Sequence, residues 1–475
     1  MADCGEREMS SRVPVIVILG ATGCGKSKLG IEIARRFGGE ILSADSMQVY
    51  KGLDIVTNKV TPEEKCLAPH HLLDIVEPLQ RFTVLDFRNR AVPIIDRLIQ
   101  NGKLPVIVGG TNYYIESLLW KVLVEEDESS LGIRKQVKSA SNEVCLDDKR
   151  QRVQADSELV YERDRRRMQE ARSQEDLESK NLSVQGDLVD LLDEAALEHV
   201  PSSHLYEKLQ AVDPDMAQGL HPNNKRKIIR SLQVYAQTSR THSAILREQR
   251  SADGGSELGG PLRYPYSCIL WLQCEQEVLD ERLHLRVDAM LEQGLLKELL
   301  DFHRLYNEER LATSTEADYT KGIFQAIGFK EFHQYLLLSE EDRNSEKGSK
   351  FFHAGVDALK LVTKRYARRQ LRWINNRFLR KTSRQVPPVY GLDATDPYFW
   401  NERVLGPAFK IVESYLEGQK PDGVEPLPVT EQSVKNELKT KHCDICDRMF
   451  VGDIQWNDHL RSKKHRRMLK RKQVL

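Results

Sequence analysis

The stretch VIVILGATGCGKSKLG, which begins at Val15, limits the possible folds of this chain more than any other feature. It contains the pattern G-x-x-x-x-G-K-[ST], which lies between an apolar run and a segment with helical periodicity. In that context the pattern predicts a P-loop, in which backbone N–H groups at a helix N-terminus surround an anion. The lysine adds a positive charge, and the hydroxyl group after it can bind magnesium. The predicted phosphate-binding residues are Gly20, Ala21, Thr22, Gly23, Cys24, Gly25, Lys26 and Ser27.

The segments around this loop indicate an α/β fold with a doubly wound parallel sheet. Three short β-rich runs, VPVIVIL, EILSAD and LPVIVGG, alternate with helical patterns such as KSKLGIEIARRF. This alternation is typical of a parallel sheet covered by helices, with ligands at the carboxyl ends of its strands. A further β-rich run, YSCILWLQC at Tyr266, indicates that the sheet continues after an interruption.

Changes in composition divide the chain into five predicted regions. We expect the first part of a P-loop catalytic domain at residues 12–123, followed by a helical, RNA-binding insertion at 124–214. The second part of the catalytic domain, with basic helices, is expected at 215–400. A Pro-rich linker at 401–437 then leads to a small zinc finger with a basic tail at 438–475.

Hydropathy and cysteine usage restrict where the protein can act. No run approaches the roughly 18 apolar residues that span a bilayer, so we expect no membrane association. Of the eight cysteines only Cys443 and Cys446 form a close pair, which favours a reducing compartment and one metal site. Acidic residues before Gly20 make the mitochondrial signal weak. We therefore expect a cytoplasmic monomer and leave a nuclear or mitochondrial form open.

The chemistry at the phosphates depends on one carboxylate. NTP hydrolases normally end a later apolar strand in an Asp that holds magnesium, whereas LPVIVGGTN ends in Gly109, Gly110 and Thr111. The carboxylate comes one β run earlier, at Asp45, beside the P-loop. There it can orient a nucleophile and accept its proton, or it can serve as an ordinary helix N-cap. Under both interpretations the pattern favours a group transferase over an ATPase.

Two basic stretches indicate a polyanionic partner. The stretch TKRYARRQLRWINNRFLRK, from Thr363 to Lys381, holds eight Lys or Arg residues and no acidic residue, with aromatic residues among them. A second basic stretch, HPNNKRKIIRSLQVYAQT, begins at His221. A single charged run is usually a solvated surface, but two such runs with interleaved aromatics favour a nucleic acid.

The C-terminal region has the spacing of a zinc finger. Its pattern is C-x2-C-x12-H-x5-H, and the ligands are Cys443, Cys446, His459 and His465. Two thiolates and two imidazoles complete a tetrahedral zinc site with no open position, so we expect the zinc to be structural. Residues 461–472 include eight basic residues in twelve, which predicts contact with a phosphate backbone.

Together these motifs resemble those of the tRNA dimethylallyltransferases, also called tRNA isopentenyltransferases. The resemblance covers residues 15–378, and the C-terminal finger is as in the eukaryotic branch. It is carried by the blocks GATGCGKS, SADSMQVYKGLDIVTNK, HHLLDI, VGGTNYYIESLLW, HPNNKRKIIRSLQVY, FQAIGFKE and RYARRQLRW. These enzymes transfer a dimethylallyl group from its diphosphate to the exocyclic amine of an adenosine just 3′ of the anticodon. The P-loop would then bind an isoprenoid diphosphate.

The resemblance also implies roles for individual residues. Asp45 would be the general base and Thr22 would contact the target amine, while Arg230 and Thr111 would help hold the diphosphate and close the reaction channel. Magnesium would bind at the diphosphate through Ser27, and the partners would be dimethylallyl diphosphate and the tRNA anticodon stem-loop. The residues expected to bind tRNA are Asp45, Ser46, Met47, Gln48, Arg226, Lys227, Arg230, Gln325, Lys330, Arg365, Arg368 and Arg369.

Two other functions account for part of the sequence. A P-loop nucleoside or nucleotide kinase, with Asp45 holding a hydroxyl acceptor, explains the P-loop but not the basic helices or the finger. A zinc-finger RNA-binding protein with a regulatory P-loop domain explains the finger but gives Asp45 no role.

Overall fold

The structure, a computed structural model, describes residues 13–122, 197, 199–313, 322–380, 384–429 and 439–472, with side chains left aside at 307–313. The chain forms two compact units. The first unit comprises residues up to 123 and residues 249–433, and the second comprises residues 124–248 and 434–475. Most of the predicted helical insertion lies outside the described residues.

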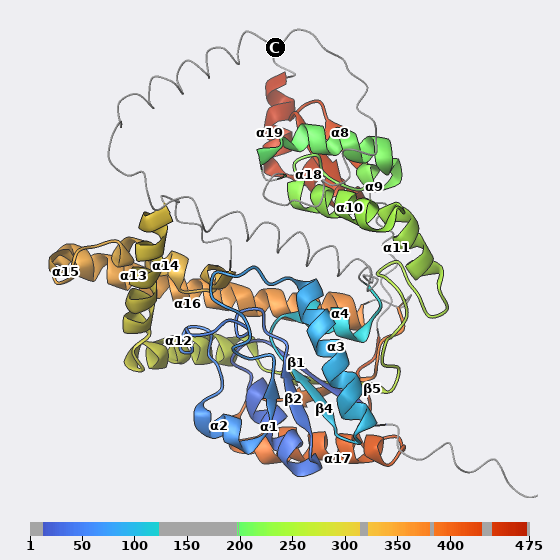
Figure 1. Cartoon of the computed structure of the whole chain (residues 1–475), viewed down its shortest axis with the longest axis vertical. Helices are drawn as coiled ribbons and strands as arrows, with labels where there is room; N and C mark the ends of the chain where they lie inside the picture. The colour runs from blue at the N-terminus through green and yellow to red at the C-terminus, as the bar shows by residue number, and fades with distance from the viewer. Residues whose placement is uncertain are drawn as a thin grey trace, which may run out of the picture. The chain divides into compact units, whose positions relative to one another are not determined.

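The first unit is built on a six-stranded parallel sheet with the strand order β3-β2-β4-β1-β5-β6. Figure 1 shows strands β1, β2, β4 and β5 of this sheet among the helices of the first unit. This sheet confirms the predicted fold class. The β-rich runs at residues 15 and 266 become neighbouring strands although about 250 residues separate them. The strands are β1 (Val15–Gly20), β2 (Glu40–Ser43), β3 (His70–His71), β4 (Pro105–Val108), β5 (Ser267–Gln273) and β6 (Val389–Asp393).

Both faces of the sheet are covered because successive strand residues point in opposite directions. Ile16 and Ile18 of β1 lie in one apolar cluster with residues of α1 (Lys26–Phe37) and α17 (Gly406–Leu416). Val15, Val17 and Leu19 lie in another cluster with residues of α3 (Val84–Gln100) and α4 (Asn112–Leu119). Burial on both faces explains why the sequence of the central strand β1 is a continuous run of apolar residues.

A third apolar cluster joins the loop after β2 to the helices that follow β5. Val49, Tyr50 and Leu53 of this loop pack with residues of these helices, among them Leu299 and Phe329. The remaining helices of this unit are α2 (Pro62–Leu67), α12 (Gln276–Glu292), α13 (Leu295–Thr313), α14 (Phe329–Leu336), α15 (Glu340–Arg343) and α16 (Glu346–Ile374), with short helical turns at Gly322–Gln325, Asn375–Leu379, Pro397–Phe399 and Asn401–Leu405.

The predicted linker at 401–437 does not begin at residue 401. Residues from Asn401 to Leu416 are helical, and Ala408, Ile411 and Val412 are buried against the sheet. The helix was not predicted because its residues, including the apolar ones, were assigned to the linker.

The second unit holds a small helical core and the finger. Its helices are α8 (Ser202–Val212), α9 (Pro214–Gln218) and α10 (Lys225–Thr238), and most of α11 (His242–Ser251) also belongs to it. The predicted boundary put α10 in the catalytic domain, but Ile228 and Leu232 of α10 pack with Leu205 and Leu209 of α8. The finger consists of β7 (Thr440–Cys443), β8 (Arg448–Val451), α18 (Asp453–Arg461) and α19 (Lys463–Lys472).

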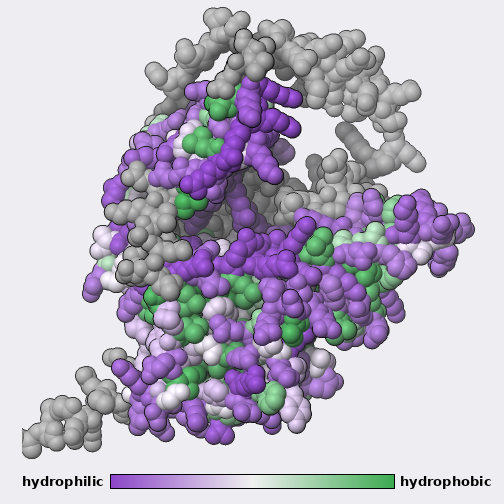
Figure 2. All heavy atoms as spheres, turned by 180° about the vertical axis from the view of Figure 1, so that it is seen from behind, coloured by the Kyte–Doolittle hydropathy of each residue, from purple (hydrophilic) through white to green (hydrophobic). Residues whose placement is uncertain are grey.

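Hydrophilic side chains dominate the visible face of the described residues in Figure 2, where the apolar patches are small and separate. Among the described helices, none combines the length and the apolar character needed to cross a membrane.

Candidate active site

A cavity of about 300 Å³ lies in the first unit, where β1, β2 and β4 end. Its position agrees with the expected ligand site of a doubly wound sheet. Asp45 is the only acidic side chain among the residues that line it. The lining includes Thr22, Gly23, Gly25, Lys26, Ser27, Asp45, Gln48, Gly109, Gly110, Arg286, Tyr366 and Gln370.

The P-loop connects the end of β1 to the start of α1. Gly23 and Gly25 have φ angles of 86° and 89°, a left-handed conformation that side chains disfavour. A Cβ atom at Gly25 would also lie 2.8 Å from the ring of Trp400, so this position has no room for a side chain. The loop therefore presents its backbone to the cavity, as a phosphate-binding loop requires.

Lys26 places a cation at the floor of this loop. Its ammonium group donates a hydrogen bond to the carbonyl oxygen of Ala21 at 2.8 Å. Burial lowers the pKa of Lys26 to about 8, with Cys24 and Asp45 opposing this shift and Arg286 adding to it. A bound polyanion would favour the charged ammonium form, because an opposite charge nearby raises the pKa of a cation.

Asp45 lies directly after β2 and faces the same cavity. Its Oδ1 accepts a hydrogen bond from the backbone N–H of Met47 at 2.9 Å. Burial raises the pKa of Asp45, although this hydrogen bond and the charges of Lys26 and Arg286 partly oppose the shift. The residues after Asp45 form a turn rather than a helix, so Asp45 does not act as a helix N-cap. A carboxylate with a raised pKa is a stronger base.

A chain of hydrogen bonds fixes Thr22 between two helices. Arg286 of α12 donates to Thr22 Oγ1 at 2.7 Å, and the Thr22 N–H donates to Gln370 Oε1 at 2.8 Å. Gln370 of α16 in turn donates to the carbonyl oxygen of Gly110 at 2.8 Å, and Tyr366 donates to the same oxygen at 3.3 Å. The P-loop, the end of β4 and helices α12 and α16 therefore form one connected wall.

Arg286 was not predicted as a site residue. Burial lowers the pKa of this arginine, while the charge of Asp45 opposes the shift. The Arg side chain remains protonated at neutral pH and adds a second cation to the cavity wall. The stretch around Arg286 is an amphipathic helix with many charged residues, and only its fold shows which of them point inward.

Thr111 supports Asp45 from outside the cavity lining. Its Oγ1 accepts a hydrogen bond from the Ser46 N–H at 2.9 Å and donates one to Ser46 Oγ at 3.2 Å. Ser46 and Met47 belong to the turn after Asp45 but are not among the lining residues, whereas Gln48 is. The predicted contacts of these residues with tRNA stay predictions.

The basic face of α16 is partly neutralised by α12. Arg368 and Lys364 both contact Asp280, at 2.9 and 3.0 Å, and Lys360 contacts Asp288 at 2.6 Å. Of the predicted tRNA contacts, Arg368 therefore already has an acidic partner.

The other predicted tRNA contacts in the first unit are exposed. They are Arg365 and Arg369 on α16, Gln325 in a short helical turn and Lys330 on α14. Arg226, Lys227 and Arg230 belong to α10 of the second unit. The role of Arg230 at the diphosphate therefore stays a prediction.

The finger brings its four predicted ligands together. The His465 Nδ1 atom lies 3.6 Å from Cys443 Sγ, 3.5 Å from Cys446 Sγ and 3.1 Å from His459 Nε2. A tetrahedral zinc ion with ordinary bond lengths separates S from N by about 3.6 Å and N from N by about 3.3 Å. These four residues are the one cluster of potential metal ligands within the described parts of the chain. The geometry fits the predicted structural zinc.

Comparisons with known families cover most of the chain. The family model described as IPP transferase matches residues 48–187 and 175–377, and the one described as isopentenyl transferase matches residues 13–67. A model described as a zinc-finger of C2H2 type matches residues 441–465.

Individual proteins agree with these families. The human tRNA dimethylallyltransferase is 43% identical over 99% of this chain and 89% of its own length. The Schizosaccharomyces pombe tRNA dimethylallyltransferase is 30% identical over 97% of this chain and 95% of its own length. A solved structure of a eukaryotic dimethylallyltransferase acting on tRNA matches with a TM-score of 0.71 at 26% identity, covering 97% of this chain and 98% of the other. The chain belongs to the tRNA dimethylallyltransferase family, the IPP transferases.

Proposed function

We propose that the protein transfers a dimethylallyl group from dimethylallyl diphosphate to the exocyclic amine of the adenosine next to the anticodon on its 3′ side, giving isopentenyladenosine. The observation that carries this proposal is the single cavity in which a P-loop with Lys26 lies beside Asp45, the one acidic lining residue. Family membership supports the choice of donor and of tRNA as the acceptor.

The reaction needs a base on one side and a stabilised leaving group on the other. The exocyclic amine of adenine is a weak nucleophile because its lone pair is delocalised into the ring. A bond forms between this nitrogen and the allylic carbon while the bond from that carbon to the diphosphate oxygen breaks. The amine proton passes to the carboxylate of Asp45, which contributes about 10²- to 10⁴-fold as a general base. The diphosphate takes the electron pair of the broken bond.

The P-loop and its neighbouring cations stabilise the departing diphosphate. Backbone N–H groups of the loop, Lys26 and Arg286 provide donors and charge where negative charge develops. Arg286 also orients the Thr22 hydroxyl group, which we assign to the target amine. The allylic carbon carries positive charge in the transition state, so the cavity must exclude water, which would otherwise compete as acceptor.

Magnesium fits this site only as a partner of the diphosphate. Asp45 is the one carboxylate in the cavity lining, and its other side-chain oxygen donors, such as Ser27, are neutral, so the protein alone offers little charge to hold a resident ion. Magnesium usually binds through substrate phosphates and few protein oxygens. We therefore expect Ser27 to hold a magnesium ion that arrives with the diphosphate and neutralises part of its charge.

The acceptor must reach the cavity as an unstacked base. A base within a stack is inaccessible to a buried site, so the target adenosine has to turn out of the anticodon loop. Loop bases are also the positions at which proteins read RNA sequence. We assign the exposed Arg365 and Arg369 of α16, with Arg226 and Lys227 of α10, to the RNA backbone. A monomeric, cytoplasmic enzyme remains our expectation.

The kinase alternative requires a different ligand at the P-loop. A kinase would bind ATP tightly and transfer a phosphoryl group, whereas a prenyltransferase needs only a diphosphate at the P-loop. We expect ATP to compete with dimethylallyl diphosphate no better than inorganic pyrophosphate does. Labelled ATP and labelled dimethylallyl diphosphate, each supplied with bulk tRNA, test this directly. Transfer of a phosphoryl group from ATP would support the kinase, and tRNA binding without any transfer would support the RNA-binding alternative.

The pKa shifts in the cavity predict a bell-shaped pH profile. Asp45 must lose its proton to act as a base, so activity rises through its raised pKa. Lys26 must keep its proton to attract the donor, so kcat/KM for the diphosphate falls above about pH 8. At saturating donor the bound anion raises the pKa of Lys26, so the alkaline limb of kcat shifts to higher pH. A kcat and a kcat/KM that decline at the same alkaline pH would contradict this assignment.

Loss of the zinc should unfold the finger and weaken RNA binding. In Cys443→Ser the zinc site loses a ligand, and zinc binding supplies the folding free energy of such a module. We expect a lower affinity for tRNA and a smaller dependence of affinity on salt, because phosphate contacts of residues 461–472 are lost. Prenyl transfer at saturating tRNA should survive, since the cavity belongs to the first unit.

The matched control is Cys66→Ser, which alters an exposed cysteine on α2. Salt-dependent tRNA binding and transfer should be measured for both variants. The finger is not fully isolated from its own unit, since Thr440 donates a hydrogen bond to the carbonyl oxygen of Gln218 at 2.7 Å. An unchanged tRNA affinity in Cys443→Ser would indicate that the finger serves another partner.

A further inference from the structure

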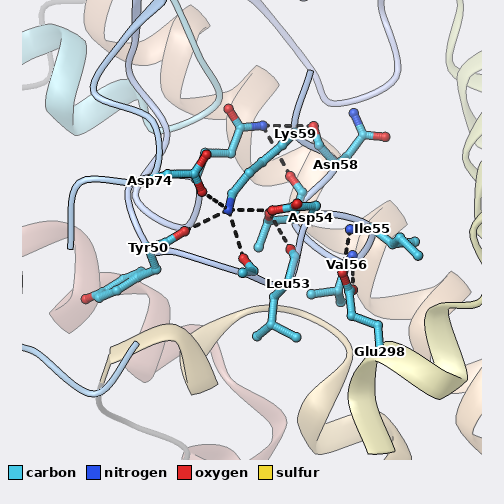
Figure 3. Close-up of polar contacts among 12 residues, drawn as sticks. Tyr50, Leu53, Asp54, Ile55, Val56, Asn58, Lys59, Asp74 and Glu298 are labelled. Carbon is cyan, nitrogen blue, oxygen red and sulfur yellow. Dashed lines mark hydrogen bonds and ion pairs between the residues drawn. The ribbon is translucent and has the colours of Figure 1, made fainter. Parts of the chain in front are cut away.

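A buried lysine organises the loop that follows β2. The side chain of Lys59 is 1% exposed. Its ammonium group donates to the carbonyl oxygens of Tyr50 and Gly52, each at 2.8 Å, and contacts the carboxylates of Asp54, at 2.8 Å, and Asp74 (Figure 3). A cation withdrawn from water requires such partners, because an unpaired buried charge is very costly.

The two carboxylates differ in how firmly they are held. Asp54 is 69% exposed, so its contact with Lys59 is partly screened by water. Asp74 is more enclosed and also contacts Lys65 at 3.1 Å. Burial acts to raise the pKa of Asp74, but the hydrogen bonds from Lys59 and Lys65 outweigh it, and the pKa is lowered. Lys59 therefore joins residues 50–54 to the segment that follows β3.

The loop that Lys59 holds has an unfavourable backbone. Leu53 and Asn58 of this loop have φ angles of 55° and 50°, and Asp74, which Lys59 contacts from the segment after β3, has a φ angle of 55°. This left-handed conformation is unfavourable for a residue other than glycine, although Asn and Asp tolerate it better. Leu53 has no polar side chain that could compensate. The surrounding contacts must therefore hold the loop in place.

A second clamp comes from α13. The two carboxylate oxygens of Glu298 accept hydrogen bonds from the N–H groups of Ile55 and Val56, both at 2.9 Å (Figure 3). Lys59 binds carbonyl oxygens of the loop, whereas Glu298 binds its N–H groups. The loop is therefore held by a cation at its carbonyl oxygens and by an anion at its N–H groups.

The far end of this loop is part of the cavity wall. Gln48 donates to the carbonyl oxygen of Thr57 at 3.2 Å and to that of Asn58 at 2.9 Å. Gln48, Thr57 and Asn58 all line the cavity, as does Asp45 three residues before Gln48. A change in the loop would therefore move the wall next to Asp45. None of the contacts of Lys59 named above involves the P-loop.

We propose that Lys59 is a positioning residue for prenyl transfer, which fixes the loop of residues 50–59 and, through Asn58 and Gln48, the wall of the acceptor pocket beside Asp45. The inference rests on the proposed function, because it assigns this wall to the adenosine and leaves the diphosphate to the P-loop. Lys59 itself touches neither substrate. Its effect on the reaction passes through the side chain of Gln48.

The test is steady-state kinetics of Lys59→Met with each substrate varied in turn. We expect the KM for an anticodon stem-loop RNA to rise, so that kcat/KM for this RNA falls by about 10- to 100-fold, since a misplacement near 1 Å costs about that much. The KM for dimethylallyl diphosphate should stay within about twofold of wild type, because the P-loop is unaffected. The matched control is Lys65→Met, which removes the other lysine at Asp74, one that is 41% exposed. It should change neither constant by more than about twofold.

A merely structural role for Lys59 predicts another pattern. Partial unfolding would lower the active fraction, so kcat would fall while both KM values stayed unchanged, and this result would overturn the proposal. Wild-type kinetics in Lys59→Met would overturn it as well.

If Lys59→Met does not fold, Asp54→Asn decides, because it weakens the cluster at an exposed position. We expect it to lower kcat/KM for the RNA by about three- to tenfold with the donor KM unchanged, and unaltered constants would overturn the proposal. Absence of transfer by the wild-type protein would instead refute the proposed function.

Discussion

Replacement of Asp45 by Asn should lower the rate of prenyl transfer by at least about a hundredfold, the usual effect of losing a general base. The substitution keeps the shape of the side chain, and the amide oxygen can still accept the hydrogen bond from the Met47 N–H. RNA binding and donor binding should therefore remain close to wild type. Single-turnover measurements with saturating substrates would isolate the chemical step from binding.

The matched control for this variant is Asp357→Asn, which removes an exposed carboxylate from α16 of the same unit. It should transfer the prenyl group at the wild-type rate. The acidic limb of the pH profile should also disappear in Asp45→Asn, because the group responsible for it is gone. Near-normal turnover in Asp45→Asn would mean that Asp45 is not the general base and only stabilises its own turn.

Replacement of Lys26 by Met should lower kcat/KM for dimethylallyl diphosphate by about 10²- to 10³-fold, the range measured when a preorganised donor to a developing anion is removed. The ammonium group lies within the P-loop, where it donates to the carbonyl oxygen of Ala21, and we propose that it neutralises the leaving group there. Affinity for tRNA should not change, because Lys26 is not among the predicted RNA contacts. Initial rates at varied donor, together with tRNA binding in the absence of donor, separate the two effects.

Lys28 provides the comparison within the same helix. It is exposed and lies 4.7 Å from the ring centre of Trp400, although it also lines the cavity. Lys28→Met removes one positive charge from α1 as Lys26→Met does, but we expect a loss below about fivefold, because a solvated charge contributes little. Equal losses in the two variants would mean that only the net charge of the loop matters.

Sequence patterns predicted the parts of the fold that depend on short, local motifs. The P-loop, the central strands and the zinc ligands each depend on a short, local pattern, and the structure contains all three. Asp45 could also be predicted to lie beside the P-loop, because the carboxyl ends of adjacent parallel strands meet at one edge. The edge strand β6 (Val389–Asp393) was not predicted, since it is short and follows two prolines.

The residues that sequence analysis missed act across long separations. Arg286 reaches Thr22 from 264 positions away, and Glu298 reaches Ile55 from 243 positions away. On its own helix each is one charged residue among many, and no local spacing marks it as inward-facing. The basic run on α16 also has a partner that is distant in the sequence. Asp280 of α12 lies beside two of its side chains, Lys364 and Arg368, which the local pattern does not reveal. The contact of the remaining basic side chains with RNA stays a prediction.

The central claim is that the P-loop binds an isoprenoid diphosphate as the donor for an adenosine amine. The most direct measurement incubates the purified chain with labelled dimethylallyl diphosphate and an anticodon stem-loop RNA, then locates the label by mass spectrometry of the digested RNA. We predict label on the adenosine 3′ to the anticodon, with one diphosphate released per group transferred. The same RNA with inosine at that position lacks the exocyclic amine and should stay unlabelled. Label on the inosine RNA, or label from ATP in place of the isoprenoid, would contradict the account.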